Sequence, residues 1–99
     1  MCFMRSDINT GAAECRNTPG AVLVDVREPD EFKSGHIPGA ANLPLSQIGK
    51  AGFDRDTPLF VCCLRGTRSI RAVSELRRMG YTKVRSIGGI TRYRGPVER

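Results

Sequence analysis

The chain has 99 residues and a formal net charge of +6, with four cysteines, one histidine and no tryptophan. This length suits one domain, over residues 1–99, and excludes a large enzyme of two domains. No apolar run approaches the ~18 residues that span a bilayer, and without a signal peptide we expect a cytoplasmic protein with no membrane partner.

The positive charge is concentrated in the second half of the chain. Residues 1–50 carry five Lys or Arg against six Asp or Glu, whereas residues 51–99 carry eleven against four. A basic surface of this kind attracts anions and speeds their arrival. Because the basic residues are dispersed, aromatic residues are few and no known binding motif occurs, we expect no nucleic-acid partner.

Strand-like and helix-like patterns alternate along the chain from residue 20 on. In order, we expect a strand at 21–26, short helices at 29–34 and 45–49, a strand at 59–63, a helix at 67–79 and a strand at 83–87. Before residue 20 only a weak helix is expected, because Gly11 and Thr18-Pro19 leave few good helix formers between them. Gly95-Pro96 should stop any helix begun near Ile90 after about one turn.

This alternation predicts the α/β class, with a parallel sheet and helices on both of its faces. In open sheets of this kind ligands bind beyond the carboxyl ends of the strands. The strand expected at 59–63 ends there, in Cys62 and Cys63, and the chain then enters a basic, glycine-containing loop. The loop is therefore the candidate active site.

The loop and the start of the next helix form a setting that stabilises a thiolate and holds anions. Backbone N–H groups at the head of the helix, together with Arg65 and Arg68, would surround a cysteine sulfur. Cys62 followed by five residues and then Arg68-Ser69 fits the signature of cysteine-dependent phosphatases. Cys62 and Cys63 cannot both face the site while the strand stays regular, because successive side chains point to opposite faces.

Four segments carry a resemblance to a known family. They are Asp25-Val26-Arg27-Glu28-Pro29-Asp30-Glu31-Phe32, Gly35-His36-Ile37-Pro38-Gly39-Ala40, Cys63-Leu64-Arg65-Gly66-Thr67-Arg68-Ser69 and Gly88-Gly89-Ile90. In this order and spacing the chain resembles the single-domain rhodaneses, a family of sulfurtransferases, over most of its length. The resemblance implies a rhodanese-like fold and an enzyme of the thiosulfate sulfurtransferase type.

The resemblance implies that Cys63 is the nucleophile. It would take a sulfane sulfur from thiosulfate or a similar anionic donor, become a persulfide and pass that sulfur to an acceptor. The loop residues would bind the substrate: Leu64, Arg65, Gly66, Thr67, Arg68 and Ser69. Among them Gly66 lets the backbone curl, Arg65 and Arg68 bind the donor's oxygens, and Thr67 and Ser69 either donate hydroxyl hydrogen bonds or cap the helix.

Two alternatives remain beside this prediction. One is a phosphatase or arsenate reductase that uses Cys62 in the longer loop. Against it, Val61 stands where such phosphatases place a histidine, and the six-residue loop from Cys63 to Arg68 suits a single sulfur atom. The other alternative is a non-catalytic interaction module built on the rhodanese fold.

The remaining candidate residues are given structural roles. The resemblance implies that Asp25 and Arg27 form an ion pair or hydrogen-bond network beneath the site, and that His36 supports the turn that contains it. We expect Cys15 and Cys62 to be buried and Cys2 to be an exposed thiol. With one histidine and no Cys-x2-Cys spacing, we expect no metal and no cofactor.

The expected partners are a small anionic sulfur donor and a thiol or cyanide acceptor. The sequence is also compatible with a protein as the sulfur acceptor and with a homodimer. A homodimer is considered because Tyr93 stands where the family usually has a tryptophan and the C-terminal segment that covers the site is short.

Overall fold

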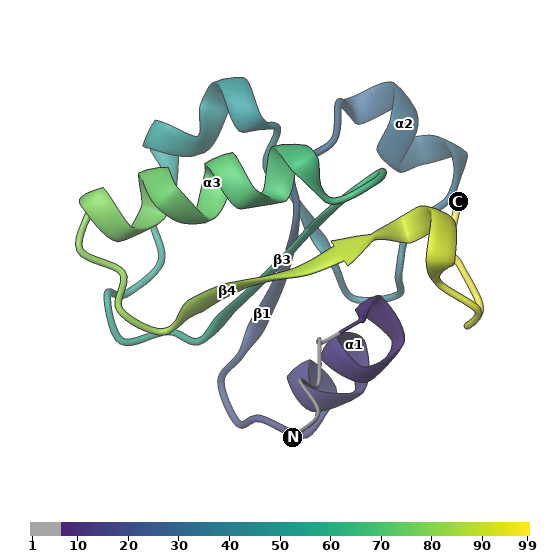
Figure 1. Ribbon diagram of the computed structural model, residues 1–99, viewed down its shortest axis with the longest axis horizontal. Coiled ribbons are helices and arrows are strands. Elements are labelled where there is room, and N and C mark those ends of the chain that lie inside the picture. Colours follow the sequence, from purple (N-terminus) through teal and green to yellow (C-terminus); the bar gives the residue numbers. More distant parts are fainter. Residues whose placement is uncertain (1–6) are drawn as a thin grey trace, which may run out of the picture.

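The computed structural model describes residues 7–99, and in this range the strands form one parallel sheet (Figure 1). In sheet order they are β2 (Ala41–Asn42), β1 (Val22–Asp25), β3 (Leu59–Cys63) and β4 (Val84–Gly89). Helices lie on both faces of the sheet (Figure 1). The predicted α/β class, with a parallel sheet between helices, is therefore confirmed. Cys2 lies outside the described residues.

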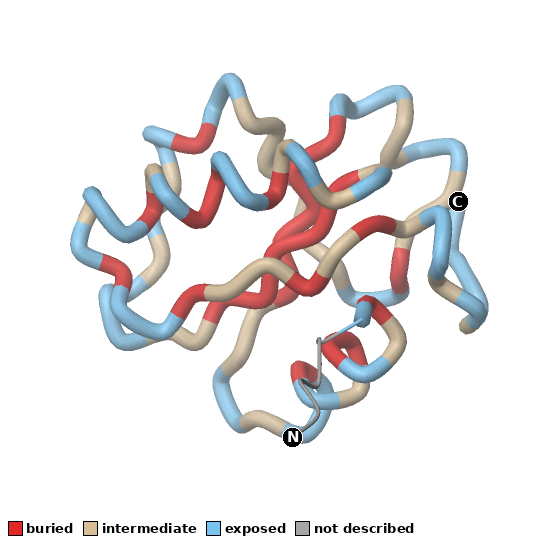
Figure 2. The backbone as a smooth tube through the Cα atoms, in the orientation of Figure 1, coloured by how far each residue is buried: buried red, intermediate tan, exposed pale blue. Residues whose placement is uncertain are grey.

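Strand β3 is the centre of the molecule, and all five of its residues are buried. It pairs with β1 on one side and with β4 on the other. Its side chains alternate between two cores, so that Val61 and Cys63 lie in one and Phe60 and Cys62 in the other. Figure 2 shows the resulting buried centre, with the exposed backbone on the outer helices and turns.

Helix α3 (Thr67–Arg78) and the 3-10 helix η1 (Leu45–Lys50) cover the face of the sheet that carries Cys63, and helix α1 (Ile8–Arg16) covers the other. The helix expected before residue 20 is present, and its packing gives it more support than its sequence indicates. Helix α1 buries Ile8, Ala12 and Cys15 against the sheet, and the Asp7 carboxylate accepts the Thr10 N–H at 2.9 Å. Packing and this cap stabilise a segment of modest helix propensity.

The other expected elements agree with the structure to within a few residues. Helix α2 (Pro29–Ser34) has the predicted bounds, and the helix expected at 45–49 is the 3-10 helix η1. Strand β4 runs two residues beyond the expected 83–87. Strand β2 was not predicted, because two residues carry no periodic pattern.

The C-terminal segment forms one turn of 3-10 helix, η2 (Ile90–Arg92), as the Gly95-Pro96 pair predicts. Beyond it the chain returns to the end of α2. There the backbone N–H of His36 donates to the Glu98 carbonyl at 2.9 Å, and that of Glu98 donates to the His36 carbonyl at 2.8 Å. Within residues 7–99, no helix has the length and apolar character needed to cross a membrane.

Candidate active site

Cys63 is the last residue of β3, and its sulfur faces the head of α3. The backbone N–H of Gly66 lies 2.9 Å from Cys63 Sγ, and the N–H of Ser69 lies 3.4 Å from it. Gly66 reaches this place because its φ is +104°, in the left-handed region that favours glycine. The loop thus wraps the sulfur in N–H donors at a helix N-terminus, where negative charge is stabilised.

Gly89 allows the loop to lie against the end of β4. A Cβ atom at this position would lie 2.3 Å from the Leu64 carbonyl oxygen and 2.5 Å from Arg65 Cα, far inside contact distance. The Thr91 N–H donates to the same Leu64 carbonyl at 3.2 Å. The Gly88-Gly89 pair therefore shapes the active-site loop. The predicted site residues did not include Gly89, although the glycine pair itself was the available signal.

The hydroxyl of Ser69 holds the base of the loop. It lies 3.0 Å from the Gly66 carbonyl oxygen and 2.7 Å from the Ser86 hydroxyl on β4. The prediction that Thr67 or Ser69 caps the helix is wrong, because the residue before the first turn is Gly66 and no side chain caps it. Thr67 is exposed at the first position of α3.

Arg68 is bound by Glu31 of α2. Its Nη1 donates to Glu31 Oε1 at 2.7 Å, and its Nη2 donates to Oε2 at 2.9 Å. The hydrogen bonds from Arg68 lower the pKa of Glu31 to about 2, and those to Glu31 raise the pKa of Arg68. Glu31 was not among the predicted site residues, because 37 positions separate it from Arg68.

Arg65 is exposed, and within residues 7–99 its guanidinium has no hydrogen-bond or ion-pair partner. The two arginines of the loop therefore differ: one is paired with a carboxylate and the other is available to a solute.

Cys62 points away from the loop, into the core beneath α1 with Phe60 and Ile87. Burial, with a smaller effect of the Asp25 charge, strongly raises the pKa of Cys62. No backbone N–H of residues 7–99 donates to its sulfur. The phosphatase alternative requires Cys62 as a thiolate at the loop, and this geometry contradicts it.

Asp25 and Arg27 form a buried bidentate pair where β1 ends. Arg27 Nη2 lies 2.8 Å from Asp25 Oδ2 and also donates to the Gly35 carbonyl at 2.8 Å. Burial opposes the charge of Arg27, yet the hydrogen bonds and charge of Asp25 raise its pKa overall. The pair thereby ties β1 to the turn that begins at Gly35.

His36 lies in that turn and contacts structural groups. Its ring stacks on Phe32 with 3.7 Å between centroids, and Nδ1 lies 2.9 Å from the Phe32 carbonyl oxygen. Nε2 is 3.6 Å from a carboxylate oxygen of Glu98. These contacts hold the end of α2 and the C-terminal segment together.

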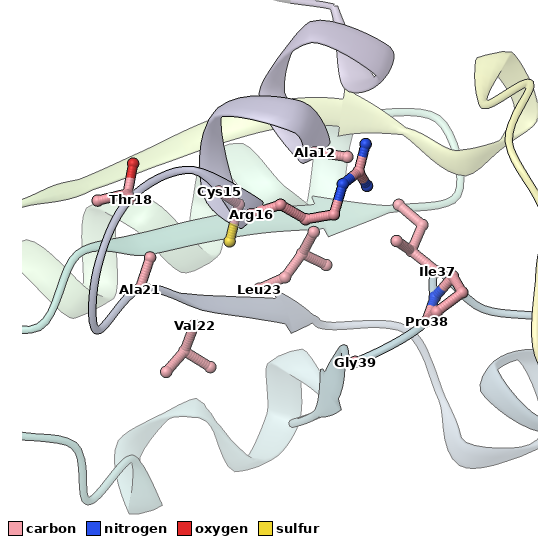
Figure 3. A pocket seen from close by; sticks show the side chains of 10 residues that line it. All are labelled: Ala12, Cys15, Arg16, Thr18, Ala21, Val22, Leu23, Ile37, Pro38 and Gly39. Atoms are coloured by element: carbon pink, nitrogen blue, oxygen red, sulfur yellow. The ribbon is translucent and has the colours of Figure 1, made fainter.

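A cavity of about 300 Å³ opens on the other face of the sheet, between α1, β1 and the turn after His36 (Figure 3). Cys15 lines it, and the Arg16 side chain extends along it toward Ile37 and Pro38 (Figure 3). Burial raises the pKa of Cys15, so its thiol stays protonated near neutral pH. No residue of the 63–69 loop lines this cavity.

Within the described part of the chain, no group of three or more His, Cys, Asp or Glu side chains is arranged to hold a metal ion.

The chain is similar in sequence to proteins of one family. The family model of the rhodanese-like domain matches residues 10–95. An uncharacterized protein of Bacillus subtilis, YqhL, is 42% identical over 79% of the chain, which spans 64% of that protein. The thiosulfate sulfurtransferase GlpE of Pseudomonas putida is 38% identical over 79% of the chain and 73% of its own length.

Among solved structures, a rhodanese from E. coli determined with anions is similar with a TM-score of 0.72. It is 31% identical, and the match covers 80% of this chain and 98% of the other.

Proposed function

Because the chain belongs to the rhodanese-like domain family, we propose that it is a sulfurtransferase that carries a sulfane sulfur as a persulfide on Cys63. The site supports this function better than hydrolysis of a phosphate. Within residues 7–99, Cys63 is the one cysteine whose sulfur is surrounded by backbone N–H donors.

The observation that carries the proposal is the pair of N–H groups, from Gly66 and Ser69, that lie 2.9 and 3.4 Å from Cys63 Sγ. These donors are placed to hydrogen-bond a negatively charged sulfur at Cys63. After sulfur transfer, the loop N–H groups of residues 64–69 are suited to the negative charge on the terminal sulfur of the persulfide. The same loop N–H groups therefore serve both the free and the persulfidated form of Cys63.

The first step is attack of the Cys63 thiolate on the outer sulfur of an anionic donor such as thiosulfate. A Cys63–sulfur bond forms, the sulfur–sulfur bond of the donor breaks, and sulfite leaves with the bonding electron pair. In the second step cyanide or a thiol attacks the terminal sulfur and Cys63 departs. With cyanide the products are thiocyanate and the Cys63 thiolate, so the reaction has two halves.

Arg65 is the residue best suited to bind the donor. Its guanidinium is exposed and has no partner among residues 7–99, while that of Arg68 is held by Glu31. We assign the anionic end of thiosulfate to Arg65, and a supporting role to Arg68, which ties α3 to α2. The relatives named as thiosulfate sulfurtransferases support this class of donor.

The proposal also includes a reducing compartment such as the cytoplasm. Cys15, Cys62 and Cys63 are all free thiols, and the reaction requires Cys63 in the reduced form.

The test is the intact mass of the protein after incubation with thiosulfate and removal of excess reagent. The wild type should gain one sulfur atom, which a cyanide treatment should remove as thiocyanate. Cys63→Ser should gain none, whereas Cys62→Ala should gain it as the wild type does.

Two results would contradict the proposal. Loss of sulfur loading in Cys62→Ala, with loading kept in Cys63→Ser, would make Cys62 the nucleophile. A folded wild type that gains no sulfur from thiosulfate, mercaptopyruvate or glutathione persulfide would instead favour a non-catalytic module.

A further inference from the structure

A groove near the 63–69 loop is lined by none of that loop's own residues. It lies between α3 and β4, the outer strand of the sheet, and has a volume of about 540 Å³. Its lining residues are Ile70, Val73, Ser74, Arg77, Arg78 and Ser86.

The groove reaches the base of the active-site loop. Ser86, which lines it, lies 2.7 Å from the Ser69 hydroxyl, and the N–H of Ser69 faces Cys63 Sγ. Ile70 is the next residue along α3. A molecule seated in the groove would therefore lie directly beside the sulfur-carrying loop.

The groove combines an apolar anchor with positive charge. Ile70 is 64% exposed, one of two large hydrophobic side chains exposed within the described residues, and Val73 lies one turn further on. Arg77 and Arg78 border the same groove. Glu75 is the only acidic residue of α3, and it is paired with Arg78 at 3.2 Å. Arginine is enriched in protein interfaces, and the buried centre of an interface is more apolar than the rest of the surface.

We propose that this groove docks an acidic, partly apolar segment of the protein whose thiol accepts sulfur from Cys63. Carboxylates of the partner would meet Arg77, whose Nη2 donates to the Val84 carbonyl at 3.2 Å, and Arg78, whose exposed pair with Glu75 is weak. An apolar side chain of the partner would cover Ile70. This inference rests on the proposed function. The partner's thiol attacks the terminal sulfur of the Cys63 persulfide, the new persulfide forms on the partner, and the thiol proton passes to the departing Cys63.

Two other occupants fit less well. A second copy of the chain would bring like charges together, since α3 is basic and each copy carries a net charge of +6. A nucleic acid would match the arginines, but no aromatic side chain lines the groove for bases to stack on, and phosphates would leave Ile70 uncovered.

Binding can be measured with two fluorescent peptides of equal length, each with one cysteine. One has Glu and Asp around a leucine, and the other has Gln and Asn in their place. The full chain should bind the acidic peptide about tenfold more tightly than the neutral one. Ile70→Ser and Arg78→Glu should each weaken acidic-peptide binding severalfold, whereas Lys50→Glu, with the same charge change at an exposed site on η1, should not.

Transfer rates give the second readout. With persulfidated protein, Ile70→Ser and Arg78→Glu should slow transfer to the acidic peptide and leave transfer to cyanide unchanged. Equal binding of the two peptides, or wild-type binding by both variants, would overturn the proposal. So would a single-stranded RNA that binds more tightly than the acidic peptide and depends on the same residues.

Failure of the docking proposal and failure of the proposed function remain distinguishable. Peptide binding is measured on unloaded protein and needs no persulfide. Protein that gains no sulfur but binds the acidic peptide through Ile70 and Arg78 would refute only the transfer chemistry. Protein that gains sulfur but does not distinguish the peptides would refute only the docking.

Discussion

The two arginines of the active-site loop have different electrostatic surroundings. The charge of Arg68 is balanced by Glu31, through hydrogen bonds of 2.7 and 2.9 Å, and that of Arg65 is open to solvent. Within residues 7–99, an incoming anion therefore meets an unpaired guanidinium on this loop at Arg65. Glu31 limits how strongly the loop attracts anions, and it joins α2 to α3.

Glu31→Gln is expected to change how stability depends on pH. Hydrogen bonds from Arg68 lower the pKa of Glu31 from 4.5 to about 2. A lowered pKa means that the charged form stabilises the fold. This stabilisation is fully present above the pKa of Glu31 in the unfolded chain, and it is lost as pH falls from 4.5 toward 2. Because the two side chains are 32% and 30% exposed, the effect should be at most about 1 kcal/mol.

The measurement is urea unfolding of wild type and Glu31→Gln across a pH series. The difference in unfolding free energy should be constant near neutral pH and should shrink between pH 4.5 and 2. Glu75→Gln, which breaks the exposed pair with Arg78, is the control and should change stability little. A difference for Glu31→Gln that stays the same throughout this acid range would refute the assignment.

At the scale of single residues, the sequence predicted the site where its chemistry depends on residues that follow one another in the chain. Cys63 could be placed at a strand end before a helix because the apolar run, Gly66 and the α3 pattern are contiguous. Glu31 and Ser86 could not be found in this way. Their contacts with the loop exist because α2 and β4 pack beside α3, and no sequence spacing encodes that packing.

The loop between β3 and α3 depends on its neighbour β4 as much as on its own residues. Gly89→Ala would put a methyl group 2.3 Å from the Leu64 carbonyl oxygen and 2.7 Å from the Arg65 carbonyl carbon. Since both are backbone atoms, the loop or the strand end must move. We expect a loss of stability of about 1–3 kcal/mol and a fall in the rate of sulfur loading of at least about tenfold.

Gly49→Ala is the matched control for Gly89→Ala. A Cβ there would meet no atom within 4 Å, and the residue lies in η1, away from the loop. Both variants should be compared by denaturant unfolding and by the initial rate of mass gain from thiosulfate. Unchanged loading by Gly89→Ala would mean that the loop does not need its close contact with β4.

At the scale of elements, prediction succeeded where a segment has its own periodic pattern. The strand at 59–63 and the start of α3 at residue 67 agree with the structure. The strength of α1 was missed because it comes from burial of Ile8, Ala12 and Cys15 against the sheet. Strand β2 exists through its pairing with β1, in which Val24 lies opposite Ala41.

Across the whole molecule, the sheet separates two chemical environments. Cys63 belongs to the core under α3, on the side of the loop, while Cys62 and Cys15 lie in the core under α1. The basic half of the chain, residues 51–99, supplies β3, the loop, α3 and β4. The excess positive charge is therefore carried by the elements that build and surround the reactive sulfur.

This charge distribution predicts that salt slows the reaction of Cys63 with anions but not with neutral reagents. Screening shortens from about 30 Å at 0.01 M salt to about 3 Å at 1 M, so attraction of an anion to the loop weakens as salt is added. Iodoacetate and iodoacetamide alkylate thiols in the same way and differ in charge. The rate at Cys63, followed by peptide mass, should fall at least about threefold with salt for iodoacetate and change little for iodoacetamide.

Arg65→Gln should reduce the salt effect, because it removes the unpaired guanidinium at the loop, whereas Lys50→Glu, an exposed site on η1, should reduce it less. Equal salt dependence for the two reagents would show that the net charge of +6 does not act at the sulfur.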